Sequence, residues 1–122
     1  MKKKLSDRIA AFVYSMDSKP LMRLTVRDLT KVFRIDRSNL IRTFKEETEL
    51  DMEKFLKQEK MFRAAQILMV PQYEHLSIKT ISEELGYCRS DYFIRQFKNY
   101  FLLTPRKFRE YKKEMRRNKA KS

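Results

Sequence analysis

The sequence contains few of the residues that interrupt helices or cross-link a chain. Its 122 residues include one glycine, three prolines, one cysteine and no tryptophan. So little glycine and proline leaves few residues for tight hairpins, while the many Leu, Lys, Arg and Glu residues favour helices throughout. A single cysteine excludes an internal disulfide framework. We therefore expect an all-α protein.

Long apolar runs and catalytic groupings are also absent from the sequence. No stretch approaches the ~18 apolar residues that a membrane span needs. The start MKKKL is similar to the basic region of a signal peptide, but Ser6, Asp7 and Arg8 interrupt any apolar region that could follow it. The single histidine, His75, has no second ligand at metal spacing. No nucleophile–base set or glycine-rich phosphate loop appears. We expect a cytoplasmic protein that is not an enzyme and holds no metal or cofactor.

Positive charge is in clear excess. The net charge is +13, and residues 62–122 carry 14 Lys and Arg against 6 Asp and Glu, compared with 15 against 10 in residues 1–61. Such an excess indicates a polyanionic partner, either nucleic acid or an acidic membrane surface.

The chain repeats itself. Two segments of the first half align with two segments of the second half without gaps, and between them the second copy has one additional residue, at Tyr92-Phe93 opposite Leu40. The aligned segments are LTVRDLTKVFRIDRSN (24–39) over LSIKTISEELGYCRSD (76–91), and IRTFKEETELDMEKF (41–55) over IRQFKNYFLLTPRKF (94–108). Chance similarity rarely keeps register this long, so the sequence indicates a duplicated supersecondary unit.

Each copy has the length pattern of a helix-turn-helix. Thr25 and Ser77 are expected N-caps of a short first helix, and after a turn of about three residues a second helix runs from about Arg37 to Glu47, or from about Arg89 to Tyr100. The expected domain covers residues 1–122. Its parts are a first helix-turn-helix unit at 5–50, a linker helix at 51–70, a second unit at 76–112 and a basic tail at 113–122.

The segments around these helices are also predicted. A first helix over 5–16 ends at Asp17–Pro20, and a long helix over 52–69, roughly 25 Å at 1.5 Å per residue, links the two units. A last helix begins at Pro105, capped by Thr104, and fades into the segment RRNKAKS.

The second helix of each copy has an inner and an outer face. Leu40 and Phe44, like Phe93 and Phe97, point inward. The outer faces combine Arg, Lys, small polar and aliphatic side chains, the groups that read base edges and phosphates in a major groove. The alternative is an ordinary amphipathic surface helix, but the exposed identities Arg42/Arg95 and Lys45/Lys98 are not demanded by folding. Two such helices must lie ~34 Å apart on one face of DNA, and the linker helix of roughly 25 Å together with its flanking turns has that order of length.

A family resemblance follows from these segments. From about Leu5 to Tyr111 the sequence resembles the DNA-binding domain of AraC/XylS-type transcription regulators. The matching segments are LTVRDL, SNLIRTFK, FLKQEKMFRAAQIL, LSIKTISEELGY and DYFIRQFKNYFLLTPRKFREY. The resemblance implies a seven-helix, homeodomain-like double helix-turn-helix with a long linker helix. It also implies promoter binding and transcription control, usually activation through RNA polymerase.

The resemblance also implies the site residues. Base-reading positions fall on Ser38, Ile41, Arg42, Ser90, Asp91, Ile94 and Arg95, to which we add Asn39. From the cationic outer faces, and not from the resemblance, we expect phosphate contacts at Arg37, Lys45, Arg89 and Lys98. Asp91 would either accept a hydrogen bond from cytosine N4 or orient Arg95. Because the repeat is head-to-tail, we expect a monomer that binds a non-palindromic site on double-stranded promoter DNA.

The sequence departs from the family at several positions. Family turns often carry glycine where this chain has Arg34, Glu49 and Leu102, so the first turn must differ or tolerate a strained residue. The segment MVPQYEHLS between the units is longer than usual by roughly three residues.

Four features allow two readings each. Cys88, next to a helix N-terminus and Arg89, is either a redox switch or an unreactive structural thiol, and we favour the unreactive structural role. Phe62 is expected to pack on the first unit rather than form a dimer contact. The acidic run at 46–53 is either a polymerase-facing patch or a solvated surface. The chain is either a stand-alone regulator or the DNA-binding part of a longer one.

Two other classes of function remain open. A nonspecific nucleoid or RNA-binding protein would use the same charge without reading bases. A helical adaptor for RNA polymerase or another regulator would bind little DNA at physiological salt.

Overall fold

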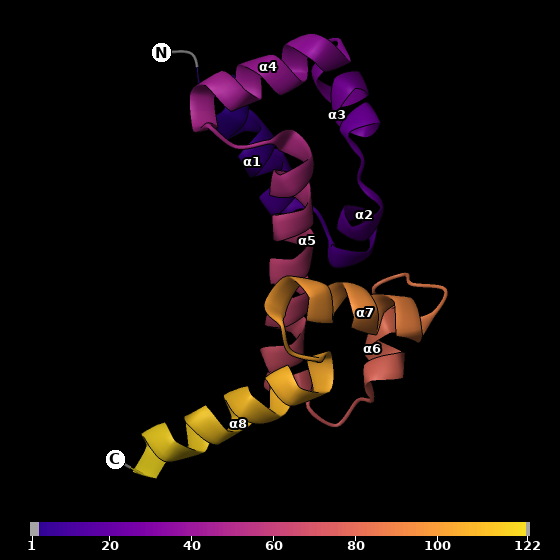
Figure 1. Cartoon of the computed structure of the whole chain (residues 1–122), viewed down its shortest axis with the longest axis vertical. Helices are drawn as coiled ribbons and strands as arrows, with labels where there is room; N and C mark the ends of the chain where they lie inside the picture. Colours follow the sequence, from indigo (N-terminus) through magenta and orange to yellow (C-terminus); the bar gives the residue numbers. More distant parts are fainter. Residues whose placement is uncertain (1–2, 122) are drawn as a thin grey trace. The chain divides into compact units, whose positions relative to one another are not determined.

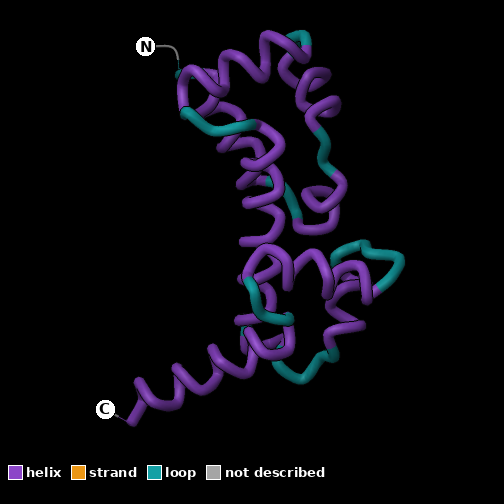
Figure 2. The backbone as a smooth tube through the Cα atoms, viewed as in Figure 1, coloured by secondary structure: helices purple, strands orange, loops and turns teal. Residues whose placement is uncertain are grey.

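A computed structural model describes residues 3–121, and all regular structure in that part of the chain is helical (Figures 1 and 2). The elements are α1 (Leu5–Ser15), α2 (Ser18–Arg23), α3 (Val26–Phe33), α4 (Arg37–Thr48), α5 (Met52–Met69), the 3-10 helix η1 (Pro71–Tyr73), α6 (Ile78–Glu84), α7 (Ser90–Phe101) and α8 (Pro105–Lys121). This confirms the all-α double helix-turn-helix. None of the described helices is both long and apolar enough to cross a bilayer.

The described residues hold eight α-helices, one more than the resemblance implies, and the additional helix is α2. Pro20 lies at its third position, where an absent N–H costs little because the first-turn N–H groups have no helical partner. The last helix also differs from expectation. It was expected to fade into the segment RRNKAKS, but α8 continues through that segment to Lys121.

The chain divides into two compact units, Met1–Lys60 and Met61–Ser122. We call them the first unit and the second unit. The linker helix α5 belongs to both, since the boundary falls between Lys60 and Met61. Each unit thus contains one helix-turn-helix: α3 and α4 in the first unit, and α6 and α7 in the second.

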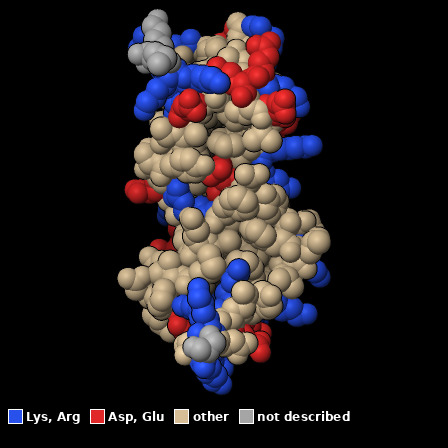
Figure 3. Space-filling model, turned by 90° about the vertical axis from the view of Figure 1, so that its left-hand side faces the viewer, with Lys and Arg blue, Asp and Glu red and all other residues tan. Residues whose placement is uncertain are grey.

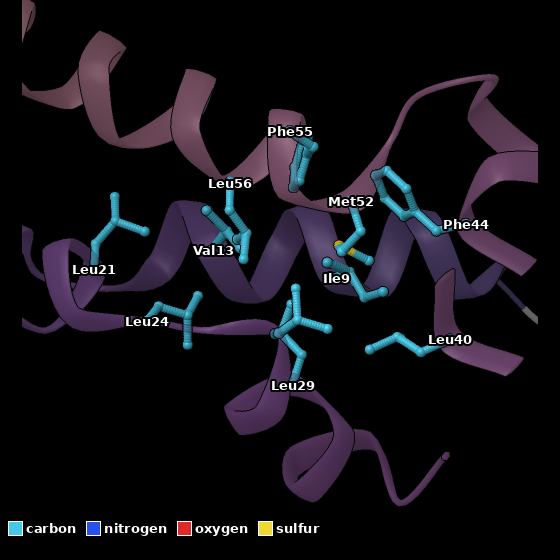
Figure 4. Packing of buried hydrophobic residues seen from close by; sticks show 11 residues of the cluster. Ile9, Val13, Leu21, Leu24, Leu29, Leu40, Phe44, Met52, Phe55 and Leu56 are labelled. Carbon is cyan, nitrogen blue, oxygen red and sulfur yellow. The ribbon is translucent and has the colours of Figure 1, made fainter. Parts of the chain in front are cut away.

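The core of the first unit draws on every helix of that unit. Figure 4 shows its side chains turned toward one another: Ile9, Val13, Leu21, Leu24, Leu29, Leu40, Phe44, Met52, Phe55 and Leu56. Spacing of four residues places Ile9 and Val13 on one face of α1, and Leu40 and Phe44 on one face of α4. Burying each such side chain stabilises the fold by about 1.5–3 kcal/mol, and this burial holds α4 against α1.

The core of the second unit is mainly aromatic. Phe93 and Phe97 of α7 are fully buried, and the Phe97 ring lies 4.6 Å from that of Phe101 and 5.4 Å from that of Phe108. Phe62 belongs to this cluster, with its ring 6.2 Å from that of Tyr100. The expectation that Phe62 packs on the first unit was therefore wrong, because its position on α5 turns it toward the aromatic end of α7.

Side chains begin the helices where the sequence predicted. Thr25 and Asp28 form a capping box at the start of α3, and the Ser77 hydroxyl accepts from the Thr80 N–H at α6. The Thr104 hydroxyl accepts from the Lys107 N–H at α8. These caps satisfy N–H groups that a helix leaves without partners.

In the described part of the chain, three non-glycine residues adopt the left-handed conformation. Arg34, Glu49 and Leu102 have φ values of 53°, 66° and 64°. They end α3, α4 and α7, at the positions where the family often has glycine. The turns therefore keep their geometry and tolerate the steric strain of a Cβ atom.

Candidate nucleic-acid interface

The second helix of each helix-turn-helix, α4 and α7, presents one polar face to solvent. On α4, Arg42 and Lys45 are exposed opposite the buried Phe44. On α7, Arg95 and Lys98 are exposed in the same arrangement. The repeated Arg and Lys residues thus occupy equivalent exposed positions, which are those a helix in a major groove would turn toward bases and phosphates.

A series of polar side-chain contacts holds Arg42 against the surface of α4. Asp36 caps the helix by accepting from the Asn39 N–H at 3.1 Å, and the Asn39 amide also donates to the Asp36 carboxylate. The Arg42 Nη2 donates to the Asn39 Oδ1 at 2.6 Å, and its Nη1 lies 3.6 Å from the Glu46 carboxylate. Arg42 and Asn39, two predicted base readers, are thereby brought together and given a defined orientation.

The equivalent Arg95 is held differently on α7. Its guanidinium lies over the Tyr92 ring, 5.8 Å from the ring centre. The Tyr92 hydroxyl accepts from the Gln96 amide at 2.8 Å, and Gln96 Oε1 accepts from the Tyr87 hydroxyl at 3.1 Å. Tyr87 packs on the buried Phe93, with ring centres 5.0 Å apart. This series of contacts connects Arg95 to the core of the second unit.

Tyr92 and Gln96 were not among the predicted site residues. Tyr92 is 47% exposed and lies beside Arg95. The sequence held two signals for it: the residue added at Tyr92-Phe93 in the second copy, and the spacing of four residues between Tyr92 and Gln96.

Arg37 and Arg89, expected to contact phosphates, have carboxylate partners within the chain. Arg37 Nη2 lies 3.4 Å from Glu53 Oε1, and both side chains are more than half exposed. Arg89 donates twice to Asp91, at 3.1 and 2.9 Å. Exposed pairs of this kind are weak, so a phosphate can compete for either guanidinium.

The Asp91 carboxylate is paired with Arg89, and Arg95 lies over Tyr92 instead. This corrects the suggestion that Asp91 orients Arg95. Desolvation acts to raise the pKa of Asp91, but the hydrogen bonds and charge of Arg89 outweigh it and lower the pKa below its usual value. The negative charge of Asp91 is thus compensated at the start of α7.

The predicted aliphatic and serine positions divide between the exposed face and its edges. Ser38 is exposed, whereas Ile41 is half-buried and packs against the core of the first unit. Ser90 and Ile94 are half-buried, and Ile94 lines a hollow of ≈ 420 Å³ beside the start of α8. Only part of each isoleucine side chain is therefore accessible to a thymine methyl group.

The acidic run at the end of α4 contributes to local structure. Glu47 Oε1 accepts from the Ser6 N–H at 2.7 Å, which caps α1 across 41 residues of sequence. Asp51 Oδ1 accepts from the Glu53 and Lys54 N–H groups and caps α5. Because Glu46 pairs with Arg42 as well, most of this run has partners inside the first unit.

Cys88 and His75 are both exposed. Cys88 aligns with Asp36 in the repeat, but α7 begins later, at Ser90 after Arg89, with no side-chain cap. Among the described residues no group of three or more His, Cys, Asp or Glu side chains could hold a metal ion.

Comparisons with known proteins agree with this geometry. A family model described as a helix-turn-helix domain matches residues 29–111. The chain is 37% identical over 87 residues to the Msm operon regulatory protein of Streptococcus mutans, covering 71% of this chain and 30% of that protein. It is 36% identical over 87 residues to the xylose operon regulatory protein of Haemophilus influenzae, covering 71% and 22%. The chain thus spans less than a third of the length of either relative.

Solved structures share the fold. The C-terminal domain of the two-component response regulator yesN from Fusobacterium nucleatum matches with a TM-score of 0.71 and 22% identity, covering 88% of this chain and 99% of that one. The structure of the xylose-binding transcription activator xylR matches with a TM-score of 0.60 and 32% identity, covering 72% and 22%.

Proposed function

Because the chain belongs to the AraC-type family of helix-turn-helix DNA-binding transcription regulators, we propose that it binds specific sequences of double-stranded promoter DNA. In this proposal α4 and α7 each enter a major groove. The family is one of DNA-binding regulators rather than a class of enzymes. Its place of action would be the bacterial cytoplasm, on the chromosome.

The observation that carries the proposal is the repeated exposed face of α4 and α7. Arg42 and Arg95 are exposed at equivalent positions, and each is oriented by a side chain three residues earlier, Asn39 or Tyr92. An arginine that is already oriented loses less conformational freedom when it bridges guanine O6 and N7. Folding of either helix does not require a cation at these positions, since neither side chain is buried.

Differences between the two faces favour two unlike half-sites. Asn39 and Glu46 accompany Arg42, whereas Tyr92 accompanies Arg95. A head-to-tail repeat with unlike faces fits a non-palindromic site bound by one copy of the chain.

An activating role rests on the relatives. Two curated relatives are named as operon regulatory proteins, and one structural neighbour as a transcription activator. We propose activation through contact with RNA polymerase.

Selection from a random pool of duplexes tests the proposal. The expected result is two different sequence blocks in a fixed order, with affinity for the selected duplex roughly 10³-fold or more above that for random duplex at physiological salt. A matched control is the same selection with the double variant Arg42→Ala/Arg95→Ala, which should return no blocks. Equal affinity of the parent for selected and random duplexes would instead support a nonspecific DNA-binding protein.

A further inference from the structure

The distal part of α8, residues 112–121, carries a charged surface that lies outside both helix-turn-helices, α3–α4 and α6–α7. Pro105 and Phe108, near its start, are buried in the second unit. From Glu114 to Lys121 every residue is exposed, and Figure 1 shows this end of α8 extending away from α6 and α7. These residues are therefore not needed to complete the core.

This segment is strongly cationic. Residues 112–121 contain one carboxylate, Glu114. Their cationic residues are Lys112, Lys113, Arg116, Arg117, Lys119 and Lys121. Figure 3 shows Lys and Arg side chains gathered at the lower end of the molecule, where α8 points toward the viewer.

The cations differ in how far the chain itself compensates them. Nearer the core, Lys113 pairs with Glu74 at 3.0 Å and Lys112 lies over the Phe108 ring. Within the described residues, the side chains of Arg116, Arg117 and Lys121 form no ion pair and no hydrogen bond, although the charges of Arg116 and Arg117 also help to lower the pKa of Glu74. One carboxylate, Glu74, thus faces Lys113, Arg116 and Arg117, and the positive charge in excess lies toward the end of α8.

Helix stability does not explain this arrangement. Lys113, Arg117 and Lys121 are successive neighbours at a spacing of four residues, and like charges at that spacing destabilise a helix. The helix dipole favours cations only within the last turn, which accounts for Lys121 but not for Arg116. An anionic partner would relieve the repulsion.

We propose that the distal part of α8 is a third DNA contact, which binds backbone phosphates of the duplex beside the half-site of α7. The inference rests on the proposed function. Ten helical residues span roughly 15 Å, the length of about four to five base pairs. Guanidinium and ammonium groups bind phosphates without reading sequence, so this contact adds affinity but no specificity.

A membrane surface fits the segment less well. An interfacial helix needs a broad apolar face opposite its charges. Beyond Phe108, α8 has only Tyr111 and Met115 as large exposed apolar side chains.

Salt dependence of binding tests the proposal. The variant Arg116→Gln/Arg117→Gln/Lys121→Gln removes three charges and keeps good helix formers. Binding of parent and variant is followed by fluorescence anisotropy on the selected duplex, with and without about ten extra base pairs beside the half-site of α7. Each lost phosphate contact should reduce the slope of log K against log salt by ~0.9. If the variant loses two to three contacts, its affinity for the extended duplex falls below that of the parent by a factor that is roughly 60- to 500-fold larger at 0.1 M salt than at 1 M salt.

The control variant Lys19→Gln/Lys31→Gln/Lys57→Gln changes the net charge equally at exposed positions of the first unit. It should keep the parental slope, while the single variant Arg117→Gln should lose about one contact. The proposal is overturned if the α8 variant keeps the parental slope, or if both triple variants lose slope equally. Binding of the segment to phosphatidylglycerol vesicles without any change of the DNA slope would also overturn it.

Failure of the proposed function looks different. In that case the parent itself would not distinguish selected from random duplex, whereas the effect of the flanking base pairs and of the α8 charges could still be measured.

Discussion

The Lys60 ammonium donates a hydrogen bond to the backbone carbonyl of Leu24 at 2.7 Å, tying α5 to the residue before the N-cap of α3. The second unit has the same connection with another donor, since Arg109 Nη1 donates to the carbonyl of Leu76 at 2.6 Å. Leu24 and Leu76 are identical positions of the repeat. In each unit, a cation from the helix that follows the helix-turn-helix, α5 or α8, therefore holds the start of that helix-turn-helix.

Burial lowers the pKa of Lys60 below its usual 10.5, although Glu53 and Asp28 act in the opposite direction. Between the folded-state pKa and 10.5 the unfolded chain binds more protons at this position, so its contribution makes stability rise with pH in that window. An NMR titration of the Lys60 side chain should give a midpoint below 10.5. A midpoint at or above 10.5 would contradict the buried geometry. The variant Lys60→Arg identifies the signal.

Replacing Leu102 by glycine should stabilise the second unit. Leu102 has φ 64° and is 82% exposed, so its side chain contributes little packing while its Cβ strains the turn. Glycine removes that strain, and the expected gain is about 0.5–1 kcal/mol after its larger unfolded-state entropy is subtracted. Urea unfolding measures the gain. The control Lys98→Gly, inside α7, should lose about 1 kcal/mol, and equal losses in both variants would contradict the expectation.

The Tyr87 hydroxyl should lose its proton at a higher pH than an ordinary tyrosine. Desolvation by burial, and next the neighbouring Tyr92, raise its pKa to about 12. The folded protein then holds this proton more tightly than the unfolded chain, so the stability from Tyr87 is present below pH 10 and is lost between pH 10 and about 12. Unfolding measured across that range should be less pH-dependent in Tyr87→Phe. Identical pH dependence in the variant and the parent would rule out this account.

The capping box of α3 should contribute to acid stability. Hydrogen bonds from the Thr25 backbone N–H and hydroxyl lower the pKa of Asp28. That contribution is present above pH 3.8 and is lost as the pH falls through the folded-state pKa of Asp28. Thr25→Ala should cost about 1 kcal/mol at neutral pH and shift the Asp28 pKa part of the way back toward 3.8. Thr25→Ser keeps the hydroxyl and should retain most of the stability and most of the lowering of the Asp28 pKa. An unchanged Asp28 pKa in Thr25→Ala would contradict the role given to the capping box.

Arg42 and Arg95 should each specify bases in a separate half-site. Arg42→Ala and Arg95→Ala are each expected to cost ~1–3 kcal/mol on the selected duplex and to relax preference in one block only. Lys45→Ala should weaken binding to all duplexes alike, because a lysine–phosphate contact reads no base. Competition anisotropy with singly substituted duplexes measures this. Uniform losses for both Arg variants would show that the two helices do not read bases directly.

The duplication made much of the fold predictable. Two copies share register, so the N-caps Thr25 and Ser77 and the linker helix could be placed from spacing and cap chemistry alone. The resemblance marked Arg34, Glu49 and Leu102 as positions where glycine is common, and for the first turn it left open a different turn or a strained residue. The structure shows a left-handed, strained residue at Arg34, and also at Glu49 and Leu102. The helix α2 was missed because Pro20 indicated an ending, whereas proline is tolerated in a first turn.

Side-chain partners of the site residues were less predictable. From the sequence, Arg89 could contact a phosphate, Asp91 or a neighbouring helix; in the structure it has an extended backbone just before α7 and pairs with Asp91. The placement of Phe62 failed for a similar reason, since helical periodicity gives a face but not the unit that covers it. The base-reading roles of the predicted residues stay predictions.

Cys88 is the single cysteine of the sequence and is exposed, so a thiol reagent can label the second unit at one defined position. A maleimide dye would attach only there, two residues before α7 begins, without any cysteine having to be removed or introduced. Its fluorescence would report when that half of the chain engages its duplex, so the order in which the two halves bind could be followed in real time.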